Sequence, residues 1–296
     1  MCWEVKAVQG WEEALALLPE PMRTAARQQD RPEAEEIRLR LGQAPTLLSG
    51  GKEAVFCEKR VTGEQLYRIL EKASGASLHT VLGALREGYL SCRGLRLGVC
   101  GLASCGESGI EGFRHITSLA IRIPHELPGL CRPWFSALYP EGFRNTVILS
   151  PPGGGKTTAL RDLIRELSDR GWRVAVADER NELSASDEGG VRFALGAHSD
   201  VMAGVPKWEA AELLLRSMNP QILAMDEIGS ADDARILERL CCSGVGILAS
   251  CHADSVDSLR RSPLFSVLAE KGLFACALVI RREYGRREYT VERVGT

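Results

Sequence analysis

A glycine-rich stretch near the middle of the chain, SPPGGGKTT beginning at Ser150, carries the residue types that bind phosphate groups. It approaches the pattern G-x-x-x-x-G-K-[ST], in which main-chain amides surround phosphates, the lysine contacts the β- and γ-phosphates and the hydroxyl ligates magnesium. The last three positions are filled by Gly155, Lys156 and Thr157. Ser150 replaces the first glycine. Because Pro151 biases the residue before it toward an extended backbone, a glycine is not required there, and we expect a working phosphate site.

The loop and the start of the following helix are predicted to hold ATP. Glycines allow main-chain conformations barred to other residues and let amides approach phosphate oxygens. A helix that starts near Lys156 would point the positive end of its dipole at the same phosphates. The Thr157 hydroxyl is the predicted ligand of Mg²⁺ within the loop. The predicted nucleotide-contacting residues are Pro152, Gly153, Gly154, Gly155, Lys156, Thr157 and Thr158.

Two adjacent carboxylates follow a second apolar segment, in the sequence ILAMDEIG. The carboxyl ends of strands in a doubly wound sheet meet at the ligand-binding edge, so Asp226 and Glu227 should stand beside the glycine loop. Asp226 is predicted to hold the Mg²⁺ shell, and Glu227 is predicted to polarise an attacking water. Such a pair can also be a solvated turn after a strand, but its combination with the glycine loop favours a nucleotide site.

Two further polar side chains follow strand-like apolar segments. Glu179, in ADERNEL after WRVAV, is an alternative water activator beside Asp178, although a polar strand exit would look the same. His252, in SCHADS after VGILA, would lie at the same edge of the sheet and could sense the γ-phosphate. A lone histidine is more often structural, so both interpretations stay open. The predicted catalytic residues are Glu227, Glu179 and His252.

Such a site commonly also needs an arginine. Phosphoryl transfer gathers negative charge, which an arginine finger commonly compensates. The candidate fingers are Arg216, Arg180 and Arg122. The sequence does not rank them, and each is also explained as an ordinary surface or ion-pair residue.

These residues need strands and helices that bring them together. Fully apolar strands are predicted at 145–150, 172–177, 220–225 and 245–250, and helices at 156–170, 207–218 and 231–244. The segments 274–282 and 286–294 could pair as a closing hairpin. Continuous apolar strands that alternate with helices are typical of a parallel sheet covered on both faces.

The first half of the chain has a mixed pattern. Helices are predicted at 11–18, 62–73 and 78–90, and strands at 35–45, within 94–113 and at 118–124. Prolines and glycines then cluster between Pro124 and Pro133, which favours a domain boundary. The predicted domains are residues 1–135, an α+β domain, and residues 136–296, the nucleotide-binding domain.

The amino-acid composition limits the classes of function that fit this chain. The 296 residues carry a formal net charge of -2, which argues against a broad nucleic-acid-coating surface. The ten cysteines form no C-x-x-C pair, so reduced and mostly buried thiols are expected. The apolar run near the N-terminus, Ala14 to Leu18, is too short for a signal-peptide core, and Leu273 to Ile280 is far too short for a membrane span. A cytoplasmic protein is expected.

Across nearly its whole length the chain resembles the stage III AA family of sporulation proteins from endospore-forming bacteria. The resemblance rests on segments that occur in order: EEIRLRLGQAP, GLRLGVCG, SLAIRIP, SPPGGGKTT, ADERNEL, HSDVMAGVPKWEAAELLLRSMNPQILAMDEIG and SCHADS. That family is similar to the hexameric ATPases of type II and type IV secretion systems. In those enzymes a phosphate loop, an acidic box, a Walker B strand and a histidine box lie along a RecA-like domain.

By this resemblance the four elements correspond to Gly153 to Thr158, Asp178–Glu179, Asp226–Glu227 and His252. SCHADS departs from the threonine-rich histidine box of the secretion enzymes. Asp226–Glu227 stands where those enzymes often have Gly-Glu. The glutamate is common to both patterns, so the resemblance carries its role over to this chain more directly than that of the aspartate. The implied fold is α/β: a RecA-like P-loop NTPase domain with a parallel sheet, preceded by a smaller α+β domain.

The function implied by the resemblance is Mg²⁺-dependent ATP hydrolysis that energises a channel between the mother cell and the forespore. The implied partners are membrane proteins of the same sporulation channel complex and further copies of this chain in a hexameric ring. The implied location is the mother-cell cytoplasm, peripherally at the membrane complex. No direct binding of nucleic acid is implied.

Two other functions fit the residues. RecA-like cores also serve nucleic-acid translocases and recombinases, and the pairs Arg260–Arg261, Arg281–Arg282 and Arg286–Arg287 hint at a basic patch. Acidic residues interrupt that patch, however, and no series of aromatic residues for base stacking is present. A nucleotide-gated scaffold without turnover is a further alternative, against which Glu227 argues.

Overall fold

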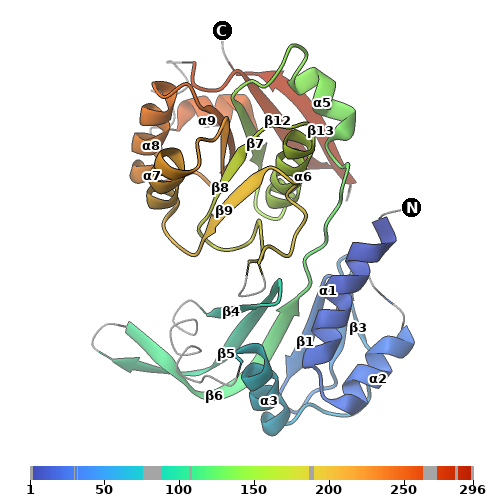
Figure 1. The fold of residues 1–296 in the computed structure, drawn as a ribbon. Coiled ribbons are helices and arrows are strands. Elements are labelled where there is room, and N and C mark those ends of the chain that lie inside the picture. Colours follow the sequence, from blue (N-terminus) through green and yellow to red (C-terminus); the bar gives the residue numbers. More distant parts are fainter. Residues whose placement is uncertain are drawn as a thin grey trace. The chain divides into compact units, whose positions relative to one another are not determined.

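The structure is a computed structural model that describes residues 3–29, 31, 33–75, 88–106, 109–186, 190–262, 272–283 and 286–294. The chain divides into two compact units (Figure 1). The first comprises Met1–Glu126 and Asp187–Arg192, and the second comprises Leu127–Ser186 and Phe193–Thr296. The division into folding domains at residues 135 and 136 stays a prediction.

The first unit contains a six-stranded antiparallel sheet with three described helices. Its elements are α1 (Trp3–Leu17), α2 (Glu20–Gln29), β1 (Glu36–Arg40), β2 (Thr46–Ser49), β3 (Lys52–Val55), α3 (Gly63–Ala73), β4 (Tyr89–Cys92), β5 (Leu95–Gly106) and β6 (Gly109–Arg122). The strand order is β3-β2-β1-β6-β5-β4, and every neighbouring pair is antiparallel.

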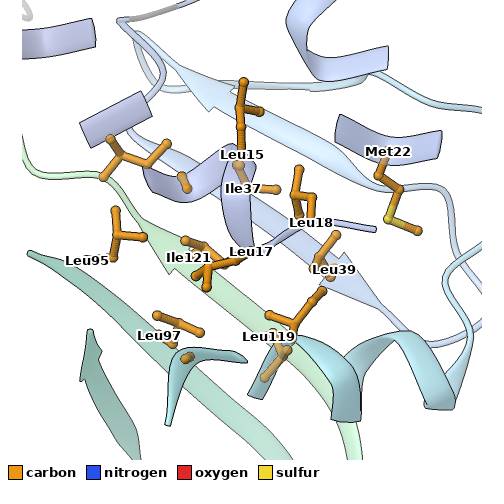
Figure 2. Close-up of a cluster of buried hydrophobic side chains, with 14 of the residues drawn as sticks. Leu15, Leu17, Leu18, Met22, Ile37, Leu39, Leu95, Leu97, Leu119 and Ile121 are labelled. Atoms are coloured by element: carbon orange, nitrogen blue, oxygen red, sulfur yellow. The ribbon is translucent and has the colours of Figure 1, made fainter. Parts of the chain in front are cut away.

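The core of the first unit lies between this sheet and its helices. Strand β1 buries Ile37 and Leu39 completely, as the alternating pattern predicted. Figure 2 shows these side chains converging with leucines of the α1 segment and of β5 and β6. Helix α3 begins where Thr62 and Gln65 form a reciprocal capping box, which satisfies amides that the first turn leaves unpaired.

The second unit is built around a seven-stranded, mostly parallel sheet. Its elements are α5 (Arg132–Leu138), β7 (Thr146–Ser150), α6 (Lys156–Asp169), β8 (Val174–Asp178), β9 (Ser199–Ala203), α7 (Lys207–Ser217), β10 (Ile222–Met225), α8 (Ala231–Cys241), β11 (Gly246–His252), α9 (Val256–Arg261), β12 (Cys276–Glu283) and β13 (Arg286–Arg293). The strand order is β13-β12-β7-β11-β10-β8-β9. All neighbours are parallel except β12 and β13, which are antiparallel.

Helices cover both faces of the second sheet, which confirms the predicted α/β class. One core cluster joins the sheet to α7, α8 and α9, and another joins it to α5 and α6. The central strands β7, β8 and β10 are buried at every residue, as their continuous apolar sequences indicated. This sheet positions the strand ends that carry the predicted site residues.

Several sequence predictions need correction. The helix predicted at 78–90 is wrong for Tyr89 and Leu90, which belong to β4 and pair with β5, and residues 78–87 lie outside the described residues. The sequence predicts short separate strands within 94–113. The structure instead has one long hairpin of β5 and β6, in which register shifts interrupt the regular pairing. Such shifts absorb the irregular glycine spacing that made the strands look separate.

The described cysteines carry free thiols, but the expectation that most are buried is wrong. Cys131, Cys251 and Cys276 are buried, whereas Cys100, Cys105 and Cys242 are exposed. Cys100 and Cys105 lie on β5, and Cys242 directly follows α8. Among the described helices, none is both long and apolar enough to cross a bilayer.

Candidate active site

The glycine loop leaves the carboxyl end of β7, and its path depends on small residues. Gly153 and Gly155 have φ angles of 72° and 106°, in the left-handed region that favours glycine. A Cβ on Gly154 would overlap the hydroxyl of Ser150, which is fully buried. The serine at the first motif position is therefore part of the packing that forms the loop. Pro152 lies exposed at the start of the turn.

Lys156 begins α6, and only 4% of its side chain is exposed. Its Nζ lies 3.1 Å from His252 Nδ1 and 3.7 Å from Glu227 Oε1. Thr158 follows in the first helical turn with a half-buried side chain. A nearly enclosed ammonium group at a helix N-terminus is the arrangement that phosphate binding uses.

The two predicted Mg²⁺ ligands meet. Thr157 Oγ1 donates a hydrogen bond of 3.0 Å to Asp226 Oδ2, which joins α6 to the end of β10. Ser250 on β11 donates to the other oxygen of the same carboxylate. Within the described residues, no group of three or more His, Cys, Asp or Glu side chains forms a metal cage. A hydroxyl and one carboxylate suit Mg²⁺, which prefers few protein ligands together with phosphates and waters.

The Asp226 carboxyl is half-buried, and its desolvation raises its pKa above the ordinary value. The neighbouring charge of Glu227 raises the pKa further, while the hydrogen bonds from Ser250 and Thr157 oppose the shift. Because the folded-state pKa is above the unfolded one, ionising this group in the metal-free protein costs stability as pH rises past the unfolded pKa. A bound divalent cation would compensate that cost.

We therefore expect Asp226→Asn to raise the melting temperature of the metal-free protein at neutral pH by a few degrees. For a fold of this size, each kcal/mol added to the free energy of unfolding raises the melting temperature by about 2–4 °C. The gain should disappear below pH ~4, where the unfolded aspartate is itself protonated. Differential scanning calorimetry with EDTA across that pH range measures the effect. A lower melting temperature at neutral pH would contradict the expectation.

Glu227 has an unusual backbone and a charged environment. Its φ of 47° places a non-glycine residue in the left-handed region. Its carboxylate accepts a 2.6 Å hydrogen bond from Arg180 Nη1 and lies 3.1 Å from His252 Nε2. Burial raises the pKa of Glu227, but the adjacent arginine and lysine charges outweigh burial and set the net shift downward. The residue is therefore ionised at neutral pH.

The two acids at the end of β8 have different environments. Asp178 is buried, and its carboxylate accepts hydrogen bonds from the main-chain amides of residues 182–184 and from the Ser184 hydroxyl. These hydrogen bonds therefore stabilise the conformation of the loop that follows β8. Glu179 is 44% exposed, and its Oε2 lies 3.7 Å from the ammonium group of Lys207.

The structure groups one candidate arginine with the predicted catalytic residues. Arg180 pairs with Glu227, as described above. Arg216 forms a surface ion pair within α7 and is 70% exposed. Arg122 lies on β6 in the first unit and pairs with Glu36 at 3.4 Å. Which arginine acts as a finger stays a prediction.

Sequence reasoning missed three polar side chains at this site. Ser250 accepts a hydrogen bond from the amide of Glu227 at 2.9 Å, in addition to its bond with the Asp226 carboxylate. Lys207 donates to main-chain carbonyls after β10. Arg287 on β13 lies against the glycine loop, where a Cβ on Gly155 would be 3.3 Å from its Nε. In the sequence, Arg287 was singled out only as part of a possible basic patch, and Lys207 and Ser250 were not singled out.

Comparison with known proteins identifies the family. The family model for sporulation stage III, protein AA, matches residues 12–291. Stage III sporulation protein AA of Bacillus subtilis (strain 168) is 33% identical over 283 residues, which cover 92% of each chain. The chain belongs to the stage III sporulation protein AA family. This confirms the family resemblance seen in the ordered motif segments.

Solved structures show which fold this stage III AA family member shares. The pilus retraction motor PilT with bound ADP superposes with a TM-score of 0.62 at 16% identity, over 92% of this chain and 83% of PilT. The ATPase DotB of Legionella pneumophila gives a TM-score of 0.56 at 15% identity, over 93% and 81% of the two chains. At identities this low, the superpositions show a common fold.

Proposed function

We propose that this chain is a Mg²⁺-dependent ATPase whose second unit is a RecA-like nucleotide-binding core. The observation that carries the proposal is the 3.0 Å contact between Thr157 Oγ1 and Asp226 Oδ2, beside the buried Lys156 ammonium group. A hydroxyl, a carboxylate and an ammonium group brought together at a helix N-terminus are what phosphoryl transfer from ATP requires. A purely structural turn has no need of all three.

The proposed binding step uses the glycine loop and α6. The amides of residues 153–158 would surround the phosphates, and Lys156 would exchange its contacts with Glu227 and His252 for phosphate oxygens. Mg²⁺, when bound, neutralises charge on the β- and γ-phosphate oxygens. Thr157 and Asp226 would hold it.

Glu227 is the proposed base that orients and polarises the attacking water. It is ionised and lies beside the phosphate-contacting lysine, whereas the alternative, Glu179, is turned toward Lys207. His252 contacts both Lys156 and Glu227, so it is suited to report the state of the γ-phosphate to the base.

The family and the fold support the proposed cellular role. Members of the family are sporulation proteins, and the fold is shared with a pilus retraction motor and with the ATPase DotB. On this basis, hydrolysis powers a secretion-like channel or assembly complex between mother cell and forespore. The chain would work in the mother-cell cytoplasm as a hexameric ring docked on membrane proteins, with Arg180, Arg216 or Arg122 completing a neighbouring site.

The alternative of a nucleic-acid translocase gains little from the surface arginines. Arg281 pairs with Glu292 at 3.1 Å, and Arg260 donates to the carbonyl of Val294 at 2.8 Å. These arginines serve contacts within the second unit, so the pairs singled out in the sequence do not need a phosphate backbone to explain them.

Steady-state phosphate release by the full-length chain tests the proposal. We expect sustained release with ATP and Mg²⁺, and loss of it when EDTA replaces Mg²⁺. Added single-stranded DNA at low salt should leave the rate unchanged. A DNA-stimulated rate that falls back as salt increases would favour the translocase, and release no higher than that of Lys156→Ala would favour a scaffold without turnover.

Replacing Arg180 should change the pH dependence of hydrolysis. Its positive charge lowers the pKa of Glu227, so Arg180→Gln should raise that pKa and move the acidic limb of the pH profile of kcat/KM to higher pH. The shift should be less than about one unit, because an exposed ion pair contributes at most about 1 kcal/mol. An arginine that acts only on a neighbouring site would lower kcat without moving this limb.

A further inference from the structure

The ammonium group of Lys207 is withdrawn from solvent at an unusual place. Lys207 is the first residue of α7, directly after Pro206, and 13% of its side chain is exposed. A positive charge at a helix N-terminus opposes the helix dipole. A lysine buried here therefore depends on compensating partners.

Those partners are the exit of β10 and two acids. Lys207 Nζ donates to the carbonyl oxygen of Glu227 at 2.7 Å and to that of Asp226 at 3.2 Å. It also lies 3.5 Å from Asp233 Oδ2 and 3.7 Å from Glu179 Oε2. Across the part of the chain that the structure describes, these are its polar contacts, and none involves the glycine loop.

The two carbonyls belong to the peptide groups on either side of the Glu227 Cα. That residue has a left-handed backbone, a strained conformation that persists only where surrounding contacts enforce it. Strand β11 holds the same segment from another direction, because Ser250 accepts the Glu227 amide at 2.9 Å and its carbonyl accepts the Ile228 amide at 2.8 Å. Lys207 and Ser250 together fix the backbone of Glu227.

Asp233 connects the lysine to α8. It is 1% exposed, and its Oδ2 accepts the amides of Gly229 and Ser230 at 2.9 and 2.8 Å. Its Oδ1 is buried and has no hydrogen-bond partner among the described residues. Lys207 supplies the positive charge that such a carboxylate needs. The ammonium group thus ties α7, the start of α8 and the end of β10 into one rigid frame.

We propose that Lys207 is the positioning residue for Glu227: by gripping both flanking carbonyls, it aims the carboxylate at the attacking water. This inference rests on the proposed ATP hydrolysis. Lys207 acts through Glu227 and has no contact with the glycine loop, so its loss should reduce turnover and leave nucleotide affinity intact. Misplacing a catalytic group by about 1 Å can cost up to about 100-fold in rate.

The test is a double-mutant cycle measured by single-turnover phosphate release. Lys207→Met should lower the rate about 10- to 100-fold while the Kd for ATP, from titration with a fluorescent ATP analogue, changes less than about threefold. In the Glu227→Gln background the same substitution should cause no further loss, because both changes remove one function. Glu209→Gln, an exposed change in the first turn of the same helix, is the matched control and should keep the native rate.

Two further variants keep the test decisive. Lys207→Arg retains the charge and should recover part of the rate lost with methionine, and Lys207→Gln serves if the methionine variant does not fold. Equal losses in both backgrounds, or a tenfold weaker ATP affinity, would overturn the inference, and so would the failure of every neutral variant to fold. If the native chain itself releases no phosphate, the proposed function is overturned together with this inference. If the native chain releases phosphate and only the predictions for Lys207 fail, the inference alone is overturned.

Discussion

Glu227→Gln should leave ATP bound and reduce phosphate release about 10²- to 10⁴-fold, the range expected when a general base is removed. Glutamine keeps the size of the side chain but loses the charge that pairs with Arg180 and lies near Lys156. It cannot accept a proton from water at neutral pH. A filter-binding assay for retained ATP and a phosphate-release assay on the same sample separate binding from hydrolysis.

Glu179→Gln is the matched comparison for this substitution. The side chain follows β8 by one residue, as Glu227 follows β10 closely, but it is directed to Lys207. We expect a much smaller loss of rate than with Glu227→Gln. If Glu227→Gln hydrolyses ATP at the native rate while Glu179→Gln does not, the base is Glu179.

Lys156→Ala should weaken ATP binding about 10- to 100-fold and abolish measurable hydrolysis. The lysine is nearly enclosed at the start of α6, and a charge-assisted hydrogen bond to phosphate contributes about 1.5–3 kcal/mol. Isothermal titration calorimetry with ATP and Mg²⁺ measures the affinity directly.

A surface lysine provides the control for that experiment. Lys52 lies exposed on β3 in the first unit, and Lys52→Ala should bind ATP like the native chain. Circular dichroism of both variants shows whether the fold is retained. Native ATP affinity in Lys156→Ala would contradict the assignment of the glycine loop as the phosphate site.

The central part of the fold was predictable because local patterns and physical rules agree there. The uniformly apolar strands before the glycine loop and before Asp226 could only be buried strands of a covered sheet. Parallel strands place their carboxyl ends at one edge, so the meeting of Asp226 with Thr157 follows from strand order and loop position.

Other features depend on tertiary contacts that leave little trace in one sequence. Asp178 looked like part of an acidic element at the nucleotide edge, yet the loop that follows β8 turns the amides of residues 182–184 onto its carboxylate. The contacts of Lys207 are with main-chain carbonyls, which carry no sequence signature. Strands as short as β2 and β3 are too brief for an alternating pattern to be distinguished from a turn.

The close packing of Ser150 against Gly154 has an evolutionary consequence. With serine at the end of β7, any side chain on Gly154 would collide with its hydroxyl. With glycine at that first position, the collision with the hydroxyl would disappear, and the tightest contact of an alanine at 154 would be the Pro151 carbonyl oxygen, 3.1 Å from the added Cβ. The two sites are therefore epistatic: which residues selection tolerates in the middle of the loop depends on which residue closes the strand before it.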